Sequence, residues 1–183
     1  ARCFLLISFA GKMNSFVNID ATSSATPLAL LRDGQDVNLF NLFIGNTSGT
    51  IGETSVIALL IGAGYLIYKK VISPKIPLAV LISFSLIIFI NKDCNFDYLL
   101  KQICGGGFII GAFFMATDYV TSPITPNGKI VFGLIVGILA AVFRLYGNSP
   151  EGMSFAIIIS NLLVPLIEKV TVPKIKSSGG KQK

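Results

Sequence analysis

Six apolar runs set the limits on what this chain can fold into. The last five follow one another with loops of only about ten residues, so a water-soluble fold would have no polar helical surface left to cover them. The runs cover residues 3–11, 55–68, 76–90, 102–117, 130–146 and 153–167. Several are nearer about fifteen than the roughly twenty residues that cross a bilayer unaided, but neighbouring helices and snorkelling Lys side chains make short spans tolerable. The sequence therefore predicts an all-α, polytopic transmembrane helical bundle in a lipid bilayer.

These runs divide the chain into four regions. We expect residues 1–13 to end a transmembrane helix, 14–53 to form an extracytoplasmic loop, 54–170 to hold five transmembrane helices and 171–183 to form a basic tail. The composition agrees, because 52% of the residues are hydrophobic and only 13% are charged. No signal peptide is visible and the chain does not begin with Met. We therefore expect the C-terminal part of a longer protein, or a chain whose first portion is missing.

The Lys and Arg residues predict the orientation of the spans. When the runs alternate across a bilayer, most basic residues fall on the side of the 69–75 loop and the tail. The opposite side holds Lys12, Arg32, Lys92, Lys101 and Arg144. The positive-inside rule then places the tail in the cytoplasm and the net acidic 14–53 loop outside it. Because the basic residues mark span ends and form no patch with interleaved aromatics, nucleic-acid binding is not expected.

The residue types exclude several kinds of catalytic centre. The chain contains no His, and its three cysteines, Cys3, Cys94 and Cys104, form no CxxC pair. His-ligated haem or zinc and a His general base are therefore ruled out, and we expect neither a metal site nor catalytic side chains. Cys94 and Cys104 have two interpretations, a pair across a loop or small apolar packing residues.

Glycines within the runs indicate close helix packing. Gly133 and Gly137 have the spacing at which two helix backbones approach closely. The triplet Gly105-Gly106-Gly107 has two interpretations. It could serve packing as well, or it could break a helix where backbone groups meet a ligand.

Thr26 lies in a small, polar run of the outer loop, Ser23-Ser24-Ala25-Thr26-Pro27-Leu28. A threonine hydroxyl does not attack a substrate without a base, and no His, Lys or Cys lies beside it. A separate enzyme could modify the hydroxyl, because the residues before it leave steric room and Pro27 holds the following backbone in an extended turn. The alternative is an ordinary Ser/Thr-rich turn.

Four motifs in order carry a resemblance to a known family. The run around Thr26 resembles the S-G-A-T-[PT]-L flavin attachment motif of the Rnf complex D subunit and of its relative, the B subunit of Na⁺-translocating NADH:quinone reductase. Residues 51–55 resemble the I-G-E-T-S segment of that family, and residues 115–123 resemble M-A-T-D-x-V-[ST]-S-P. Residues 150–153 and 161–168 resemble P-E-G-[MV] and N-x-x-x-P-L-[IF]-[DE].

Two positions qualify the resemblance. Tyr119 favours the Rnf side, because the quinone reductase usually has Pro there. Ser24 departs from the motif, which usually has Gly at this position. Both Ser and Gly are small, so the attachment enzyme should still fit.

The resemblance implies a covalent flavin and a role in electron transfer. FMN would be joined through its phosphate to the Thr26 hydroxyl by a flavin transferase outside the cytoplasm, with Ser23, Ser24 and Ala25 beside it. The chain would be an inner (plasma) membrane subunit that relays electrons, coupled to Na⁺ or H⁺ transport, among partner subunits with iron–sulfur clusters and flavin. NAD and ferredoxin would bind elsewhere in the complex. The related reductase also suggests a second, noncovalent flavin (riboflavin) between the spans.

A second polar segment could support the flavin. Thr50 and Glu53 have capping-box spacing, which predicts a helix that starts here and runs into the membrane. The backbone N–H groups at such a start, around Gly52 and Thr54, attract anions, and a flavin phosphodiester is one. The alternative is a helix cap and nothing more.

Two acidic residues are candidates for an ion pathway. Asp118 and Glu168 lie at the predicted cytoplasmic ends of their spans, where a carboxylate could take up a cation or proton. The resembled family connects an acid at the Glu168 position with cation uptake. A surface pair between Glu168 and Lys169 is the alternative.

Three rival functions stay open. The nearest is the B subunit of the quinone reductase. Another is a flavin-free secondary transporter or channel with the 105–107 glycines near a substrate site. The third is a purely structural membrane subunit.

Overall fold

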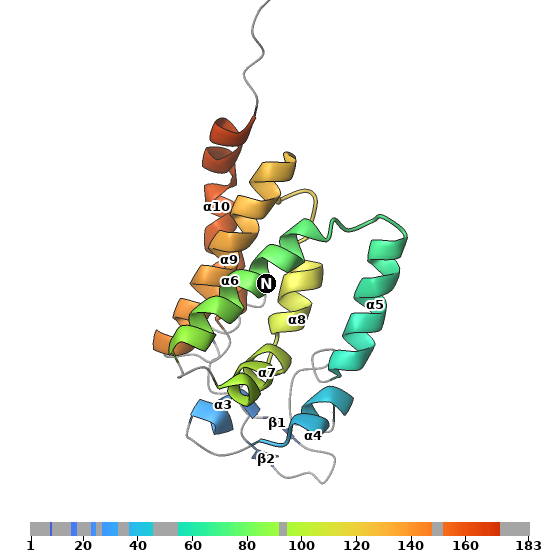
Figure 1. The fold of residues 1–183 in the computed structure, drawn as a ribbon, viewed down its shortest axis with the longest axis vertical. Helices are drawn as coiled ribbons and strands as arrows, with labels where there is room; N and C mark the ends of the chain where they lie inside the picture. The colour runs from blue at the N-terminus through green and yellow to red at the C-terminus, as the bar shows by residue number, and fades with distance from the viewer. Residues whose placement is uncertain are drawn as a thin grey trace, which may run out of the picture.

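The computed structural model describes residues 8, 16–17, 23–24, 27–32, 37–45, 55–91, 95–147 and 152–172. One short antiparallel pairing occurs in this part of the chain, between β1 (Phe16–Val17) and β2 (Ser23–Ser24). All the other regular elements there are helices, and the longer ones lie side by side as a bundle (Figure 1). The predicted all-α class is therefore confirmed.

Four of the predicted apolar runs coincide with described helices, while two short described helices lie in the predicted 14–53 loop. In chain order the described helices are α3 (Pro27–Arg32), α4 (Leu39–Ile44), α5 (Val56–Tyr68), α6 (Lys75–Asn91), α7 (Phe96–Cys104), α8 (Phe108–Ile110), the π-helical turn η1 (Gly111–Met115), α9 (Pro126–Tyr146) and α10 (Met153–Thr171). The predicted runs at 55–68, 76–90, 130–146 and 153–167 coincide with α5, α6, α9 and α10. Apart from residue 8, the predicted run at 3–11 lies outside the described residues.

α6 supplies one continuous buried stripe to the core. Ile76, Val80, Phe84 and Ile88 recur every four residues, so they share one face of the helix, and each is at most 2% exposed. α6 packs against α9, and α9 packs against α10. η1 contacts α6 and α10, while α5 lies at the edge of the bundle against α4 and α8 (Figure 1).

Two glycines let α9 approach α6 closely. A Cβ atom at Gly133 would lie 2.7 Å from the Cβ of Ala79. A Cβ atom at Gly137 would lie 2.6 Å from the carbonyl oxygen of Val80. Any side chain at either position would press the two helices apart, so the close packing predicted from the glycine spacing is confirmed.

The predicted run at 102–117 is not one helix, which corrects the sequence-based expectation. α7 ends at Cys104, and the next helical segment, formed by α8 and η1, is bent from α7 by 69°. Gly105 is extended and Gly106 has φ +65°, a left-handed conformation that favours glycine. The helical hydrogen-bond ladder cannot continue through these two residues, so the triplet at 105–107 is a break.

The described helices differ in how far they could extend across a bilayer. α9 and α10, with 21 and 19 residues, are long and apolar enough to cross, and the bent pair of α7 with α8–η1 could supply a third span. α5 and α6 are apolar but shorter, with 13 and 17 residues. The arrangement of five crossings therefore stays a prediction. Exposed apolar side chains, among them Ile61, Ile90 and Leu162, suit contact with lipid.

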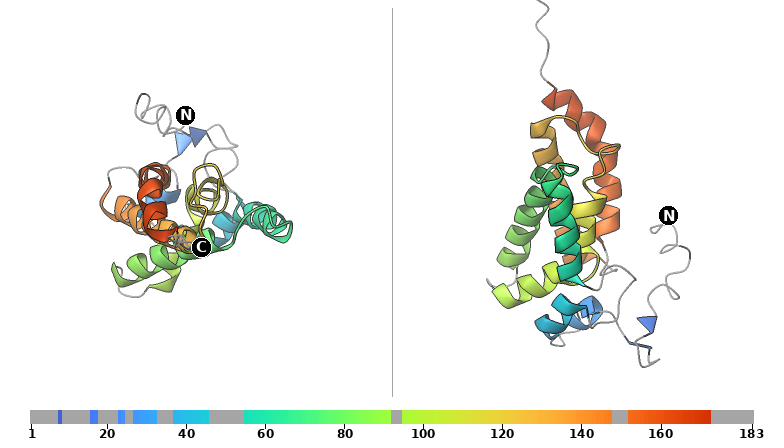
Figure 2. Two further views of the ribbon diagram at one scale, coloured as in Figure 1. Left: turned by 90° about the horizontal axis from the view of Figure 1, so that it is seen from above. Right: turned by 90° about the vertical axis from the view of Figure 1, so that its right-hand side faces the viewer.

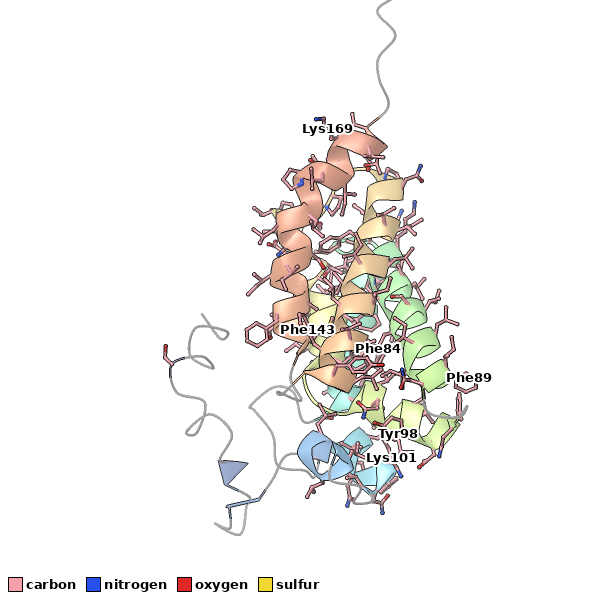
Figure 3. The ribbon with its side chains drawn as sticks, turned by 90° about the vertical axis from the view of Figure 1, so that its left-hand side faces the viewer. Phe84, Phe89, Tyr98, Lys101, Phe143 and Lys169 are labelled. Carbon is pink, nitrogen blue, oxygen red and sulfur yellow. The ribbon has the colours of Figure 1, made fainter. Side chains whose placement is uncertain are left out.

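Charged side chains are divided between the two ends of the bundle. The end formed by the 69–75 loop, the 118–125 loop and the C-terminus of α10 carries Lys69, Lys70, Lys75, Lys129 and Lys169. α3, α4 and α7 lie at the opposite end (Figure 2). Figure 3 shows Lys169 and Lys101 far apart at these two ends. This division matches the grouping of basic residues that the sequence predicts.

Candidate functional site

α3 lies against the helix break between α7 and α8. It begins at Pro27, the residue after Thr26, and its Leu28 is only 3% exposed. A Cβ atom at Gly105 would lie 2.8 Å from Leu28 Cδ1, and one at Gly106 would lie 3.4 Å from Leu28 Cδ2. The absence of side chains at these two glycines therefore leaves the space that Leu28 occupies.

Arg144, in the last turn of α9, holds the same break from inside the bundle. It is 9% exposed, and its guanidinium donates hydrogen bonds to the backbone and side-chain oxygens of Gln102, the latter at 3.4 Å from Nη1 to Oε1. It also donates to the carbonyl oxygen of Gly105, at 3.3 Å. The last carbonyls of a helix carry partial negative charge and have no partner within the helix. Arg144 thus satisfies carbonyls at the C-terminal end of α7.

Two aromatic rings complete the surroundings of Arg144. The guanidinium carbon lies 5.3 Å from the ring centroid of Phe84 and 5.6 Å from that of Phe108. The two ring centroids are 4.1 Å apart, with the ring planes tilted by 34°. A guanidinium at this distance from aromatic rings gains cation–π attraction. Through these contacts Arg144 connects α6, α7, α8 and α9.

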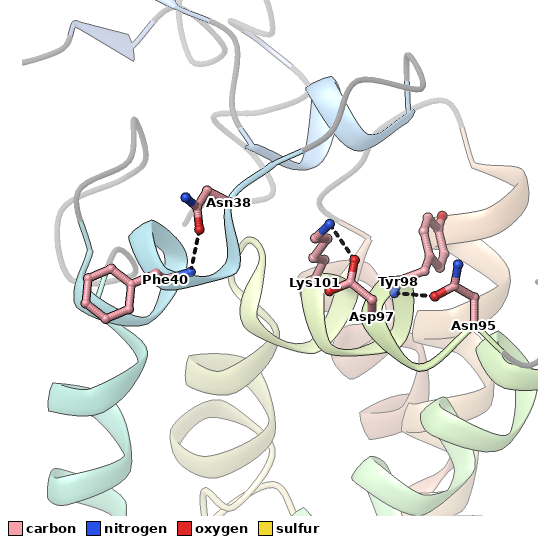
Figure 4. Close-up of polar contacts among 6 residues, drawn as sticks. All are labelled: Asn38, Phe40, Asn95, Asp97, Tyr98 and Lys101. Carbon is pink, nitrogen blue, oxygen red and sulfur yellow. Dashed lines mark hydrogen bonds and ion pairs between the residues drawn. The ribbon is translucent and has the colours of Figure 1, made fainter.

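α7 presents a polar face at this end of the bundle. Asn95 caps the helix by accepting a hydrogen bond from the N–H of Tyr98, at 3.2 Å (Figure 4). Lys101 Nζ pairs with Asp97 Oδ2 at 2.5 Å, and the Lys101 side chain is 9% exposed while that of Asp97 is 59% exposed. Gln102 Nε2 donates to the Tyr98 hydroxyl at 2.9 Å. Two largely buried cations, Lys101 and Arg144, therefore lie near α3.

A neighbouring cap holds α4 in the same region. Asn38 Oδ1 accepts a hydrogen bond from the N–H of Phe40 at 3.1 Å, which starts α4 (Figure 4). α4 ends at Gly45, whose φ of 99° turns the chain. A Cβ atom at Gly45 would lie 3.0 Å from Ser55, so the end of α4 packs on the start of α5.

The flavin-related residues predicted from the sequence are only partly within the described chain. Ser23 and Ser24 form β2, whereas Ala25 and Thr26 lie outside the described residues. The predicted capping segment, which contains Thr50, Gly52, Glu53 and Thr54, also lies outside them. The apolar helix that follows begins only at Val56, because Ser55 is extended and its Oγ accepts a hydrogen bond from the N–H of Ala58 at 3.4 Å.

The structure also identifies residues that the sequence analysis missed. Its place in the chain predicts that Arg144 is a charge at the end of a span, but Arg144 is a buried residue of α9. Its position in an apolar run was a signal, since an ionisable residue inside such a segment is a functional candidate by default. Leu28 and Gln102 gave no comparable signal, because only the tertiary contacts reveal their roles. Cys104 is buried and unpaired, as the packing interpretation predicts.

Comparison with known proteins places the chain in a family. The NQR2, RnfD, RnfE family matches residues 1–177. The chain belongs to this family. It is 41% identical over 184 residues to the D subunit of the Na⁺-translocating ferredoxin:NAD⁺ oxidoreductase complex of Acetobacterium woodii, with 96% of this chain and 56% of the relative covered. It is 36% identical to the D subunit of the proton-translocating ferredoxin:NAD⁺ oxidoreductase complex of Clostridium ljungdahlii, with 94% and 58% covered.

A third relative of the NQR2, RnfD, RnfE family gives the same picture. The D subunit of the ion-translocating oxidoreductase complex of Mannheimia succiniciproducens is 40% identical over 169 residues, which cover 86% of this chain and 48% of the relative. The chain thus spans about half the length of the curated relatives it matches. All three relatives are named as subunits of redox enzyme complexes that move ions.

The two candidate ion-pathway acids of this family member lie at the end opposite α3. Asp118 is exposed and accepts hydrogen bonds from Val120 N–H at 3.4 Å and from Thr121 Oγ1 at 3.2 Å. Glu168 is half-buried, and its Oε1 accepts a hydrogen bond from the N–H of Ile124 at 3.1 Å.

Both acids therefore organise the 118–125 loop. Glu168 makes no ion pair with Lys169, although the structure describes both residues, so the surface pair considered from the sequence is not formed. Within the described residues no group of three or more His, Cys, Asp and Glu side chains could hold a metal ion.

Proposed function

We propose that this chain is the D subunit of an Rnf-type, ion-translocating ferredoxin:NAD⁺ oxidoreductase, and that it carries FMN joined by a phosphoester to Thr26. In this proposal it relays electrons between flavin and iron–sulfur partner subunits, coupled to Na⁺ or H⁺ transport. The observation that carries the proposal is the family match over residues 1–177, together with relatives that are named as D subunits of such complexes. The run around Thr26 supplies the attachment residue.

The distribution of charge supports an extracytoplasmic flavin. Five lysines gather at the end of the bundle opposite α3, whereas two cations on the α3 side, Lys101 and Arg144, are largely buried. The positive-inside rule assigns the lysine-rich end to the cytoplasm. α3 and the neighbouring Thr26 then face outward in a multi-pass inner (plasma) membrane protein, with the C-terminus in the cytoplasm.

The described residues near Thr26 fit an FMN phosphoester. Thr26 directly precedes α3, and α3 is seated on the helix break by Leu28, so the tether leaves from a fixed element. The charge of Lys101 is offset by Asp97, but the positive charge of Arg144 beside the helix break favours a nearby phosphodiester. FMN, when bound, supplies the one- and two-electron chemistry, and the chain holds and orients it.

Denaturing gels test the covalent flavin. Full-length protein, produced with its flavin transferase, should retain yellow flavin fluorescence after denaturation, and Thr26→Val should lose it because the hydroxyl is gone. Thr26→Ser keeps a hydroxyl and should keep fluorescence, while Thr22→Val controls for a threonine change in the same loop. Equal fluorescence in Thr26→Val and wild type would remove Thr26 as the attachment site.

Further measurements separate the rivals. Co-purification with quinone reductase subunits instead of a ferredoxin-linked set would favour the B subunit. Solvent extraction of the folded protein should release any noncovalent flavin. Flavin in the extract, in addition to the covalent FMN, would identify the second, noncovalent flavin. An unmodified Thr26 peptide in mass spectra of protein from cells that contain the transferase would favour a structural subunit.

A flavin-free transporter is the second candidate, because the helix break at 105–107 resembles the discontinuous helices at which transporters bind solutes. Solute flux through the reconstituted protein without any redox partner would support it. If no such flux is measured and covalent flavin is present, the result favours the electron-relay function over the transporter.

A further inference from the structure

Leu28 and Arg144 contact the same pair of glycines from different elements. Leu28 of α3 places its two methyl carbons over Gly105 and Gly106. A Cβ atom at Gly106 would lie 3.4 Å from Leu28 Cδ2 and 3.5 Å from Arg144 Nη2. Leu28 and the guanidinium therefore both lie close to the position that a side chain at Gly106 would take.

The guanidinium fixes the position of this backbone. Arg144 donates to the carbonyl oxygens of Gln102 and Gly105, which come just before and at the start of the break. The fork of the guanidinium binds both carbonyls at once, and the rings of Phe84 and Phe108 keep it in place. Gly105 and Gly106 could adopt many backbone conformations, because glycine is flexible. The hydrogen bonds from Arg144 favour the one with the left-handed turn at Gly106.

The position of Leu28 in turn limits the position of Thr26. Consecutive Cα atoms lie about 3.8 Å apart, so the Cα of Thr26 can lie no more than about 8 Å from that of Leu28. Contacts that fix the position of Leu28 therefore also restrict the position of any group attached at Thr26.

We propose that Arg144 is a positioning residue for the flavin-bearing segment: it holds the Gly105–Gly106 backbone as a seat for Leu28, and Leu28 docks α3. This inference rests on the proposed function, because it gives the docked segment a flavin to orient. A merely structural Arg144 would stabilise the bundle but would leave α3 and the flavin where they are when it is changed.

The test uses the full-length protein in its native complex, with Arg144→Gln and Leu28→Ala as disruptive variants. Hydrogen exchange of the peptide that covers 27–32 reports docking of α3 and needs no flavin. We expect this exchange to become at least about tenfold faster in both variants, as expected when a short segment loses its tertiary contacts. Iodide quenching of flavin fluorescence in the folded complex reports the flavin position, and we expect it to increase in both.

Matched variants separate docking from general stability. Arg144→Lys keeps the charge but cannot bind two carbonyls with a planar fork, so its exchange should be intermediate. Leu30→Ala lies on the same short helix and Val142→Ala lies on the exposed face of α9, and neither should change exchange at 27–32 or quenching. If Arg144→Gln fails to fold, Arg144→Lys tests the role of Arg144. Leu28→Ala then tests the docking of α3, which lies outside the bundle (Figure 2).

Two outcomes overturn the proposal. One is wild-type exchange at 27–32 in Leu28→Ala or in folded Arg144→Gln. The other is faster exchange with unchanged flavin quenching, which would mean that docking does not position the flavin. A wild-type protein without covalent flavin would refute the proposed function instead, and the exchange measurement would still decide whether Arg144 seats α3.

Discussion

Replacing Gly137 with alanine tests how tightly α9 packs on α6. The new Cβ atom would lie 2.6 Å from the carbonyl oxygen of Val80, roughly 1 Å inside ordinary contact, and it would overlap Ser83 Oγ. The Val80 carbonyl is helix backbone and cannot rotate away. Overpacking of this kind costs about 1–3 kcal/mol. If Ser83 moves, its hydrogen bonds to the carbonyl oxygens of Ala79 (2.9 Å) and Val80 (3.2 Å) are also lost, at a cost of about 1 kcal/mol.

Gly64→Ala is the matched control. Gly64 lies in α5, and a Cβ atom there would meet nothing within 4 Å, so alanine brings only its better helix propensity, about 1 kcal/mol. Both variants gain the same helix propensity. The unfolding free energy of Gly137→Ala should therefore be about 2–4 kcal/mol lower than that of Gly64→Ala. Reversible SDS unfolding in mixed micelles, followed by far-UV circular dichroism, measures it. Equal unfolding midpoints for the two variants would refute the close packing of α9 on α6.

Two further predictions concern caps and loops. Ser55→Ala should destabilise the start of α5 by about 0.5–1 kcal/mol, which is the low end for an N-cap because the hydrogen bond of Ser55 is long. Ser73→Ala, in a loop, is the control. Equal SDS unfolding midpoints for the two variants would contradict the cap. Glu168→Ala should speed hydrogen exchange at the Ile124 amide, whereas Glu168→Gln keeps an oxygen acceptor and should leave exchange slow. Fast exchange in both Glu168 variants would mean that the loop needs the charge and not the hydrogen bond.

The sequence predicts the long helices well because their apolar runs leave few alternatives. α9 and α10 contain the runs at 130–146 and 153–167 and extend them to the length that a bilayer requires, and the Gly133/Gly137 spacing already identifies a closely packed face of α9. A hydrophobic run, however, reports which residues avoid water and not where the backbone turns. The run at 102–117 therefore resembles one segment, although two glycine conformations divide it.

The candidate site was harder to predict because its contacts join distant parts of the chain. The glycine triplet allows either packing or a break, and the choice is made by Leu28 and Arg144, which lie far from it in sequence. Nothing local to Leu28 distinguishes it from its neighbour Leu30. Arg144 carried a signal in its own apolar run, but a count of loop charges treats it as solvent-exposed. Thr26 became a candidate only through its motif, since a threonine in a polar loop has no distinguishing chemistry.

Phe84 contacts both the packed face of α9 and the side chain of Arg144. It lies in the α6 stripe that packs on α9, and its ring also lies beside the Arg144 guanidinium. A change in its size would therefore disturb helix packing and the glycine turn together, so this end of the bundle offers little freedom for redesign from within. α3 lies outside the bundle and Leu28 is not a member of the buried cluster that joins α6, α9 and α10, so exchange of Leu28 for other apolar side chains changes its seat with less effect on that cluster. Changes around the proposed flavin site would therefore disturb the bundle least if they are made in α3.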